Sequence, residues 1–224
     1  MLLRQRAVIA LATYLLLLVL HLAVRLAGEA TWATRSQWVL MPALALVLLA
    51  SPVPRSRLWR WTLAGVGFSW LGDLLPDLVP SAAAFPVLIA SFAVAQGCFA
   101  AGFWPFRGGS VAGRPVMYAY LAVAVVLVLV CAPGSGPLLA PVVVYAALIT
   151  VMAILATGVH PLTGVGAVVF LASDSLIALN AFVASWELPH QGFWVMLTYG
   201  IAELLIVLGV LARGRSAARD SLGP

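Results

Sequence analysis

Charged side chains are scarce in this chain. Only 8% of its 224 residues are charged, 64% are hydrophobic, and the mean hydropathy is +1.11. Ordinary soluble domains have about 25% charged residues. This composition excludes a soluble globular fold and predicts an all-α polytopic membrane protein, built as a bundle of transmembrane helices.

Residues suited to disulfide bonds or metal sites are also few. The two cysteines, Cys98 and Cys131, lie inside apolar runs, so neither is placed to form an extracellular disulfide framework or a zinc site. The three histidines, His21, His160 and His190, fall near the ends of different expected helices, and no metal cluster is expected from them. The sequence therefore predicts neither a bound metal nor another cofactor.

Two common enzyme signatures are missing. The chain contains no G-x-S-x-G segment, and no histidine lies at the depth of the buried serines, which argues against a serine hydrolase. The glycine-rich segments "GVGAVVF" and "FRGGSVAG" lack the lysine and the preceding strand of a phosphate-binding loop. We interpret them as a close helix contact and a flexible loop.

Long apolar runs make up most of the chain. Division at the Pro, Gly and Arg clusters, with about 20 apolar residues for each span, predicts about eight transmembrane helices. The first apolar run is longer than the roughly 7 to 15 residues of a signal peptide, so we expect a membrane helix there. The expected organisation is one transmembrane domain, residues 1–212, and a short basic cytoplasmic tail, residues 213–224. The helices are expected at residues 7–27, 37–51, 61–76, 82–104, 115–132, 138–157, 162–184 and 191–212.

The 12 basic residues are all arginines, and their distribution predicts the orientation in the membrane. Successive helix ends lie on alternate sides of the membrane. Counted in this way, ten arginines lie on one side and only Arg25 and Arg35 lie on the other. By the positive-inside rule, the arginine-rich side, which includes both termini, is cytoplasmic. Orientation and contact with anionic membrane lipids explain these arginines without a nucleic-acid partner. The ten are Arg4, Arg6, Arg55, Arg57, Arg60, Arg107, Arg114, Arg213, Arg215 and Arg219.

A faint internal repeat predicts two parallel four-helix halves. "WLGDLL" and "LASDSLIAL" align Asp73 with Asp174, and "AVAQGCF" and "GIAELLI" align Gln96 with Glu203. Four helices later the chain runs in the same direction, so the two halves would have the same orientation. Short matches in a chain rich in Ala, Leu and Val also arise by chance, so both origins stay open.

Three acidic residues are expected near the middle of the membrane. Asp73, Asp174 and Glu203 each lie about twelve residues from the end of an expected helix, or ~18 Å at 1.5 Å per residue. A charge at this depth costs about 2.5 to 3.5 kcal/mol, so such residues face the interior of a bundle or a water-filled cavity. Hydrogen bonds that only hold helices together are the alternative explanation. Three acids at one depth favour a functional site, whereas Asp77 is expected at a helix end.

Polar neighbours support a cavity around these acids. Ser69 precedes Asp73 by one helical turn, and the two share a helix face. Tyr199 precedes Glu203 in the same way, so the two members of each pair can form a hydrogen bond. Each of these residues alone is explained by a contact between helices, but together they predict a polar cavity. The other polar residues in the expected helices are Gln96, Tyr145, Ser173, Ser175 and Asn180.

An ordered set of segments resembles the YhhN family of integral membrane proteins. The segments are "WLGDLL" at 70–75, "SFAVAQGCFAAGF" at 91–103, "PVVVYAALITVM" at 141–152, "AVVFLASDSLIALNAF" at 167–182 and "TYGIAELLIVLG" at 198–209. The resemblance runs from about Met41 to Gly209. Its most specific part is the "F-x-x-S-D-S" segment together with the earlier "G-D".

The resemblance implies an enzyme in a bacterial plasma membrane. Characterised members are lysoplasmalogenases, ether-bond hydrolases that cleave the vinyl ether of a lysophospholipid to a fatty aldehyde and a glycerophospho-ethanolamine or -choline. The two family aspartates implied in catalysis carry over to Asp73 and Asp174. Two positions depart from the family pattern, because many members have His at Gln96 and Gln at Glu203.

Vinyl ether hydrolysis needs an acid that protonates the alkene carbon and a negative group beside the resulting oxocarbenium ion. Two buried carboxyl groups can supply both, because desolvation and repulsion favour one protonated and one ionised member. The paired carboxyl groups of a glycosidase likewise act as an acid and a carboxylate on either side of an oxocarbenium-like transition state. We expect one of Asp73 and Asp174 to be the acid and the other the carboxylate, in an order that the sequence leaves open. Substrate or supporting contacts are expected from Ser69, Gln96, Tyr145, Asn180, Tyr199 and Glu203.

Two other functions use the same buried acids. A proton-coupled lipid or metabolite transporter would carry protons on them at a repeat interface. An intramembrane aspartyl protease would use two membrane aspartates, and "WLGD" faintly resembles the glycine-aspartate motif of that class. The rest of the chain resembles the YhhN family, which makes the hydrolase the leading hypothesis.

Overall fold

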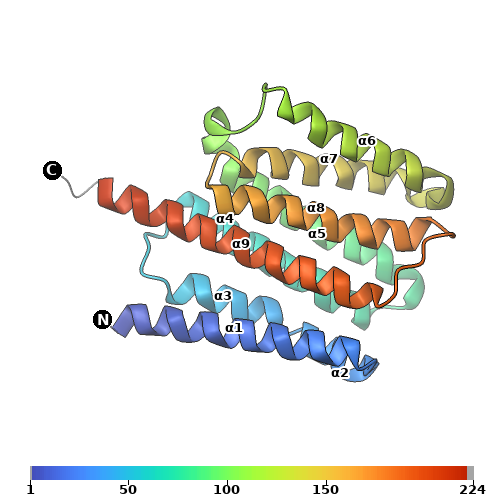
Figure 1. Cartoon of the computed structure of the whole chain (residues 1–224), viewed down its shortest axis with the longest axis horizontal. Coiled ribbons are helices and arrows are strands. Elements are labelled where there is room, and N and C mark those ends of the chain that lie inside the picture. Colours follow the sequence, from blue (N-terminus) through green and yellow to red (C-terminus); the bar gives the residue numbers. More distant parts are fainter. Residues whose placement is uncertain (1, 221–224) are drawn as a thin grey trace.

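The computed structural model describes residues 2–220, and side chains for residues 5–219. This part of the chain consists of helices and their connecting segments and contains no strand. The long helices lie side by side along the long axis of the molecule, and the two ends of the chain lie at the same end of the bundle (Figure 1). The side chain of Arg4 and residues 221–224 of the expected tail lie outside the described part.

Every expected membrane span corresponds to helical structure. The second span contains two helices, α2 and α3, and three short 3-10 helices, η1 to η3, continue or link the others. The bounds are α1 Leu2–Leu26, α2 Ala30–Gln37, α3 Leu40–Ala50, α4 Arg57–Leu74, η1 Leu75–Leu78, α5 Ser81–Phe103, η2 Trp104–Gly109, α6 Val116–Ser135, η3 Gly136–Leu138, α7 Leu139–Ala156, α8 Pro161–Phe182 and α9 Gln191–Asp220.

Several boundaries differ from the prediction because helices extend beyond the apolar runs. The second expected span begins seven residues early, as the polar helix α2, and is interrupted before α3. Helix α4 begins at Arg57 rather than at residue 61, since Ser56 caps it by accepting a hydrogen bond from the backbone N–H of Trp59 at 3.2 Å. Helix α9 continues to Asp220, because its arginines and alanines are good helix formers.

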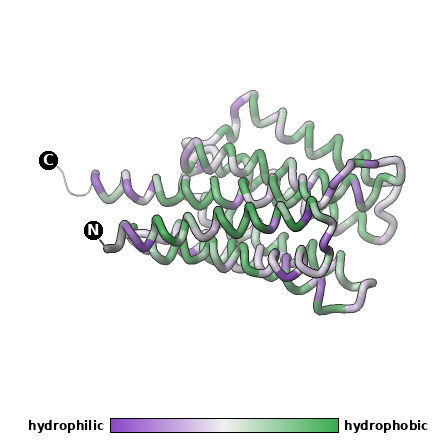
Figure 2. Tube along the Cα trace, turned by 60° about the horizontal axis from the view of Figure 1, so that its bottom comes forward, coloured by the Kyte–Doolittle hydropathy of each residue, from purple (hydrophilic) through white to green (hydrophobic). Residues whose placement is uncertain are grey.

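Within the described residues 2–220, six segments are long and apolar enough to cross a membrane. One of them, Val116–Ala156, contains both α6 and α7, so seven passes are counted by this criterion. Helix α4 is not among them, and the expected eight is therefore approximate. Apolar residues cover most of the length of the bundle, and hydrophilic ones concentrate toward its ends (Figure 2). Large apolar side chains such as Val8, Leu16 and Leu129 are exposed, as expected for surfaces that face lipid.

Two helix pairs pack especially closely, and small residues permit it. In the α4–α5 pair, a Cβ atom at Gly72 would lie 2.6 Å from the Phe92 ring. In the α8–α9 pair, a Cβ atom at Gly166 would lie 2.8 Å from the carbonyl oxygen of Ala202. These pairs are the third and fourth spans of each expected half, as a repeat requires, and the duplication stays a prediction. The packing places the polar residues of α4, α8 and α9 inside the bundle.

Candidate active site

Asp73, on α4, is the most completely hydrogen-bonded of the three membrane acids. Its side chain is 6% exposed. Oδ1 accepts a hydrogen bond from Nε2 of Gln37, at the end of α2, at 2.9 Å. Oδ2 accepts one from the hydroxyl group of Tyr199, on α9, at 2.9 Å. The carboxyl group of Asp73 therefore connects three helices.

Glu203, on α9, is fully buried and is only partly paired. Its Oε1 accepts a hydrogen bond from the hydroxyl group of Ser69, on α4, at 2.6 Å, whereas its Oε2 makes no hydrogen bond. The bonds that were possible within each helix, Ser69 to Asp73 and Tyr199 to Glu203, are not the ones that form. The hydroxyl groups instead reach across to the facing helix, because the contact between α4 and α9 points the polar faces of both helices at each other.

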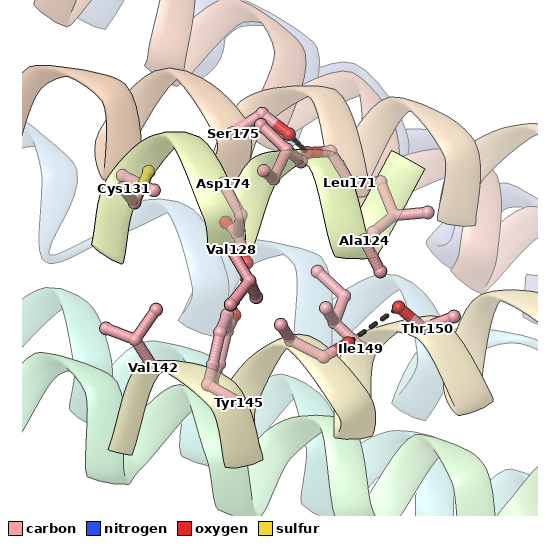
Figure 3. Close-up of a pocket in the computed structure, with 13 residues that line it drawn as sticks. Ala124, Val128, Cys131, Val142, Tyr145, Ile149, Thr150, Leu171, Asp174 and Ser175 are labelled. Carbon is pink, nitrogen blue, oxygen red and sulfur yellow. Dashed lines mark hydrogen bonds between the residues drawn. The ribbon is translucent and has the colours of Figure 1, made fainter. Parts of the chain in front are cut away.

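Asp174, on α8, forms a separate pair with Tyr145, on α7. The Tyr145 hydroxyl group donates a hydrogen bond to Oδ2 of Asp174, and the two side chains point toward each other (Figure 3). Among residues 5–219, no side chain or backbone group forms a hydrogen bond with the other oxygen, Oδ1. Asp174 is half-buried, in contrast to Asp73 and Glu203. One oxygen of Asp174 is thus available to a bound molecule.

Two clefts meet at this pair, and both are predominantly apolar. The first lies between α6, α7 and α8, and the second between α5, α7 and α8. Val142, Tyr145, Asp174 and Ala178 line both. The hydroxyl groups of Thr150 and Ser175 in the first cleft donate to carbonyl oxygens of their own helices (Figure 3). Asp174 and Tyr145 therefore contribute a carboxyl group and a phenol group to clefts that are otherwise predominantly apolar.

Glu203 connects the two centres electrostatically. It interacts with both Asp73 and Asp174, and Tyr145 interacts with it as well. The Phe92 ring packs edge-on against Tyr199, with centroids 5.7 Å apart, and also lines the second cleft. Glu203 thus interacts through charge with both the Asp73 centre and the Asp174 centre. Within residues 5–219 no three acidic, histidine or cysteine side chains are grouped as a metal site requires.

Comparison with known proteins identifies the family. The model of the YhhN family matches residues 32–210. The chain belongs to the YhhN family. Lysoplasmalogenases of Mycobacterium bovis (strain ATCC BAA-935 / AF2122/97) and Mycobacterium tuberculosis (strain CDC 1551 / Oshkosh) are each 31% identical to it over 189 residues, or 81% of this chain and 70% of the relative. No solved structure matches. As a YhhN protein with long apolar helices, the chain is an integral membrane protein.

The remaining polar residues predicted from the sequence differ in their burial and in their hydrogen bonds. Gln96, on α5, is fully buried near the Tyr145 hydroxyl group, but neither amide atom makes a hydrogen bond. Ser173 donates to the carbonyl oxygen of Val195 at 3.1 Å and so joins α8 to α9. Asn180 is exposed, and its side chain forms no hydrogen bond with another residue of the described part of the chain.

Three residues around Asp73 were missed by sequence reasoning. Gln37 contacts Asp73 directly, although it stands at a polar helix end where an interfacial side chain is the simpler expectation. Arg25, counted only for orientation, donates to Gln37 at 2.8 Å. Tyr14, on α1, is fully buried and donates to the carbonyl oxygen of Gly200 at 2.8 Å. Its position in the middle of an apolar run was the one available signal. Arg25 and Tyr14 lie before the segment that the YhhN model matches.

Proposed function

We propose that this YhhN protein is a lysoplasmalogenase-type hydrolase of the membrane. The observation that carries the proposal is the Asp174–Tyr145 pair, which is set between two apolar clefts and interacts through charge with the buried Glu203. An alkenyl chain fits apolar walls, and its reactive double bond needs an acid beside it. The names of the two mycobacterial relatives support the same reaction class.

The proposed reaction balances with water as the only co-reactant. A carboxylic acid transfers its proton to the alkene carbon that is remote from the ether oxygen, which produces an oxocarbenium ion. Water adds to the carbon that carries the oxygen and returns a proton to the site, giving a hemiacetal. The hemiacetal collapses to a fatty aldehyde, and the glycerol oxygen leaves as a hydroxyl group with the remaining proton.

Asp174 is the proposed general acid. It lines both clefts, and its Oδ1 makes no hydrogen bond within residues 5–219, so a proton on this oxygen can reach a bound alkene. Tyr145 holds the other oxygen and fixes the orientation of the carboxyl group. General acid catalysis by a positioned side chain contributes about 10²- to 10⁴-fold.

Asp73 is the proposed anionic partner. Both of its oxygens accept hydrogen bonds, a pattern that suits a carboxylate, because a carboxylate offers only acceptors. Glu203 interacts through charge with both Asp73 and Asp174. In a medium of low dielectric, a fixed negative charge stabilises a developing cation more strongly than it would in water.

The proposed substrate is a lysophospholipid with a 1-alkenyl chain and an ethanolamine or choline headgroup. The chain would occupy the clefts beside α7 and α8, and it would enter from the bilayer past α6, which exposes apolar side chains along its outer face. The proposed location is a bacterial plasma membrane with both termini in the cytoplasm, where the arginine-rich end of the bundle would meet anionic lipids.

Purified protein in detergent, given a lysoplasmalogen, tests the proposal. We expect release of a fatty aldehyde and of glycerophospho-ethanolamine or -choline, according to the headgroup of the substrate, in equal amounts. The matched lysolipid with a saturated alkyl ether is the control and should not react, because it has no alkene to protonate. No aldehyde, together with proton-linked uptake of lipid into liposomes, would support a transporter instead. Cleavage of a membrane peptide would support a protease.

A further inference from the structure

A chain of hydrogen bonds runs from Arg25 to the carboxyl group of Asp73. Nη2 of Arg25 donates to Oε1 of Gln37 at 2.8 Å, and Nε2 of Gln37 donates to Oδ1 of Asp73 at 2.9 Å. From this geometry we infer that Arg25 and Gln37 are positioning residues that hold Asp73 as an oriented carboxylate. The catalytic part of this inference rests on the proposed hydrolase function.

The direction of the chain follows from the donor properties of its members. A guanidinium group has five N–H donors and no acceptor, so the oxygen of the Gln37 amide must face Arg25. The NH₂ group of the same amide then faces Asp73 and can only donate to it. A proton on Oδ1 of Asp73 would meet another hydrogen rather than a lone pair. Arg25 therefore disfavours protonation at that oxygen through an intervening neutral side chain.

Arg25 is itself held in place by a second set of contacts. The hydroxyl group of Ser36 donates to the carbonyl oxygen of Trp32 at 2.6 Å, so its lone pair is left to accept from Nδ1–H of His21 at 2.8 Å. Nε2 of His21 then carries the lone pair that faces Nε of Arg25, at 3.5 Å. His21 is fully buried, and a Cβ atom at Gly192 would lie only 3.0 Å from Nη1 of Arg25. The guanidinium group has little room to turn away from Gln37.

This arrangement distinguishes the two aspartates. The titratable groups around Asp73 are Tyr199, which donates to Oδ2, and Tyr14, Arg25, Asp77 and Glu203, which interact with it through charge. Within the described part of the chain, Asp174 accepts a hydrogen bond from Tyr145 and from no arginine. The chain from Arg25 thus provides a physical reason for Asp73 to be the carboxylate and Asp174 the acid. Helix α1, which lies before the matched YhhN segment, takes part in the site through it.

Steady-state kinetics test the positioning role. Gln37→Glu keeps the size of the side chain and an acceptor for Arg25 but replaces the donor that faces Asp73, and Arg25→Gln removes the charge at the far end. Each is expected to lower kcat on the order of 10- to 100-fold with little change in KM. Because both act through one chain, the double variant should lose no more than the more impaired single variant. Arg35→Gln, at an exposed position of α2, is the control and should keep both constants.

Infrared spectroscopy of the carboxyl groups tests the same inference without turnover. At neutral pH, Asp73→Asn should remove no protonated-carboxyl band from the wild-type spectrum. In an Arg25→Gln or Gln37→Met background, the same Asp73→Asn change should remove such a band. A protonated-carboxyl band from Asp73 in the wild type, or its absence in both backgrounds, would overturn the inference. If the wild type shows the expected spectrum but cleaves no lysoplasmalogen, the proposed hydrolase function fails while the role of Arg25 stands.

Discussion

The hydroxyl group of Tyr199, on α9, donates a hydrogen bond to Asp73, on α4, across 126 positions of the sequence. A second hydrogen bond runs the opposite way, because the hydroxyl group of Ser69, on α4, donates to Glu203, on α9. Each helix thus supplies one acid and one hydroxyl donor, and each acid is bonded by the other helix. Loss of either hydroxyl group would leave a buried acid short of a partner, which costs about 1 to 3 kcal/mol or more.

Neutralising either aspartate should stop the reaction while the bundle still forms. Asp174→Asn removes the proposed proton donor, and Asp73→Asn removes the proposed negative charge, so aldehyde release should fall by about 10²- to 10⁴-fold. Asp77→Asn is the matched control on the same segment. Its side chain is exposed, and an asparagine oxygen can still accept the bond from Trp38, so it should keep its activity. Full activity in the Asp73 or Asp174 variant, with normal insertion and folding, would remove the mechanism.

Tyr145→Phe should slow turnover by releasing the carboxyl group of Asp174. Proton transfer to the alkene leaves a negative charge on Asp174, and a hydrogen bond to a charged group contributes about 1.5 to 3 kcal/mol, which corresponds to about 10- to 100-fold in kcat. The rate of aldehyde release at saturating substrate measures the effect. Tyr118→Phe, on the exposed face of α6, is the control and should match the wild type. Equal rates for both variants would mean that the Tyr145 hydroxyl group does not orient the acid.

Glu203→Gln should keep turnover and raise thermal stability. The amide can still accept from Ser69, and the change removes a third acid that interacts through charge with Asp73 and Asp174. Removal of an ionisable, incompletely paired carboxyl group from this buried site should raise the unfolding midpoint, by about 2 to 4 °C for each kcal/mol gained. A fluorescence melting curve measures the unfolding midpoint, and the aldehyde assay on the same preparation measures turnover. Loss of turnover would instead make Glu203 a participant in proton transfer.

A bulky side chain at Ala178 should obstruct the substrate. This residue lines both clefts beside Asp174, so Ala178→Trp would fill them without altering an acid. We expect kcat/KM to fall on the order of tenfold or more, chiefly through KM. Ala172→Trp, on an exposed position of the same helix, is the size-matched control. Unchanged kinetics in the Ala178 variant would show that the alkenyl chain binds elsewhere.

Gly72→Ala should destabilise the bundle, although alanine favours helices. The new Cβ atom would meet the ring of Phe92 at 2.6 Å, and this buried ring already packs against Phe170 and Tyr199. Overpacking of this kind costs about 1 to 3 kcal/mol, more than the ~1 kcal/mol that alanine contributes to helix propensity. Gly67→Ala, on the same helix, has nothing within 4 Å of the added atom and should be neutral or stabilising. Thermal unfolding of the pair measures the difference.

The membrane class, the helical fold, the family and the acids inside the bundle follow from sequence alone. Hydropathy is a local property of the chain, and apolar runs of sufficient length must hydrogen-bond internally in lipid, so most helices can be read directly. The polar helix α2 and the early start of α4 could not be read in this way, because capping and tertiary contacts stabilise them rather than apolar composition. The order of the motifs along the chain was enough to indicate the YhhN family.

Tertiary structure alone decided which groups meet. A count of residues along a helix fixes the depth of a side chain, but the rotation of that helix about its axis depends on how it packs against its neighbours. Sequence reasoning therefore paired Tyr199 with Glu203 on one helix, whereas packing of α9 against α4 directs Tyr199 to Asp73. It also made no prediction for Gln37, whose amide the fold turns inward to Asp73. The side-chain partners of these buried acids are properties of the packed bundle, not of any one segment.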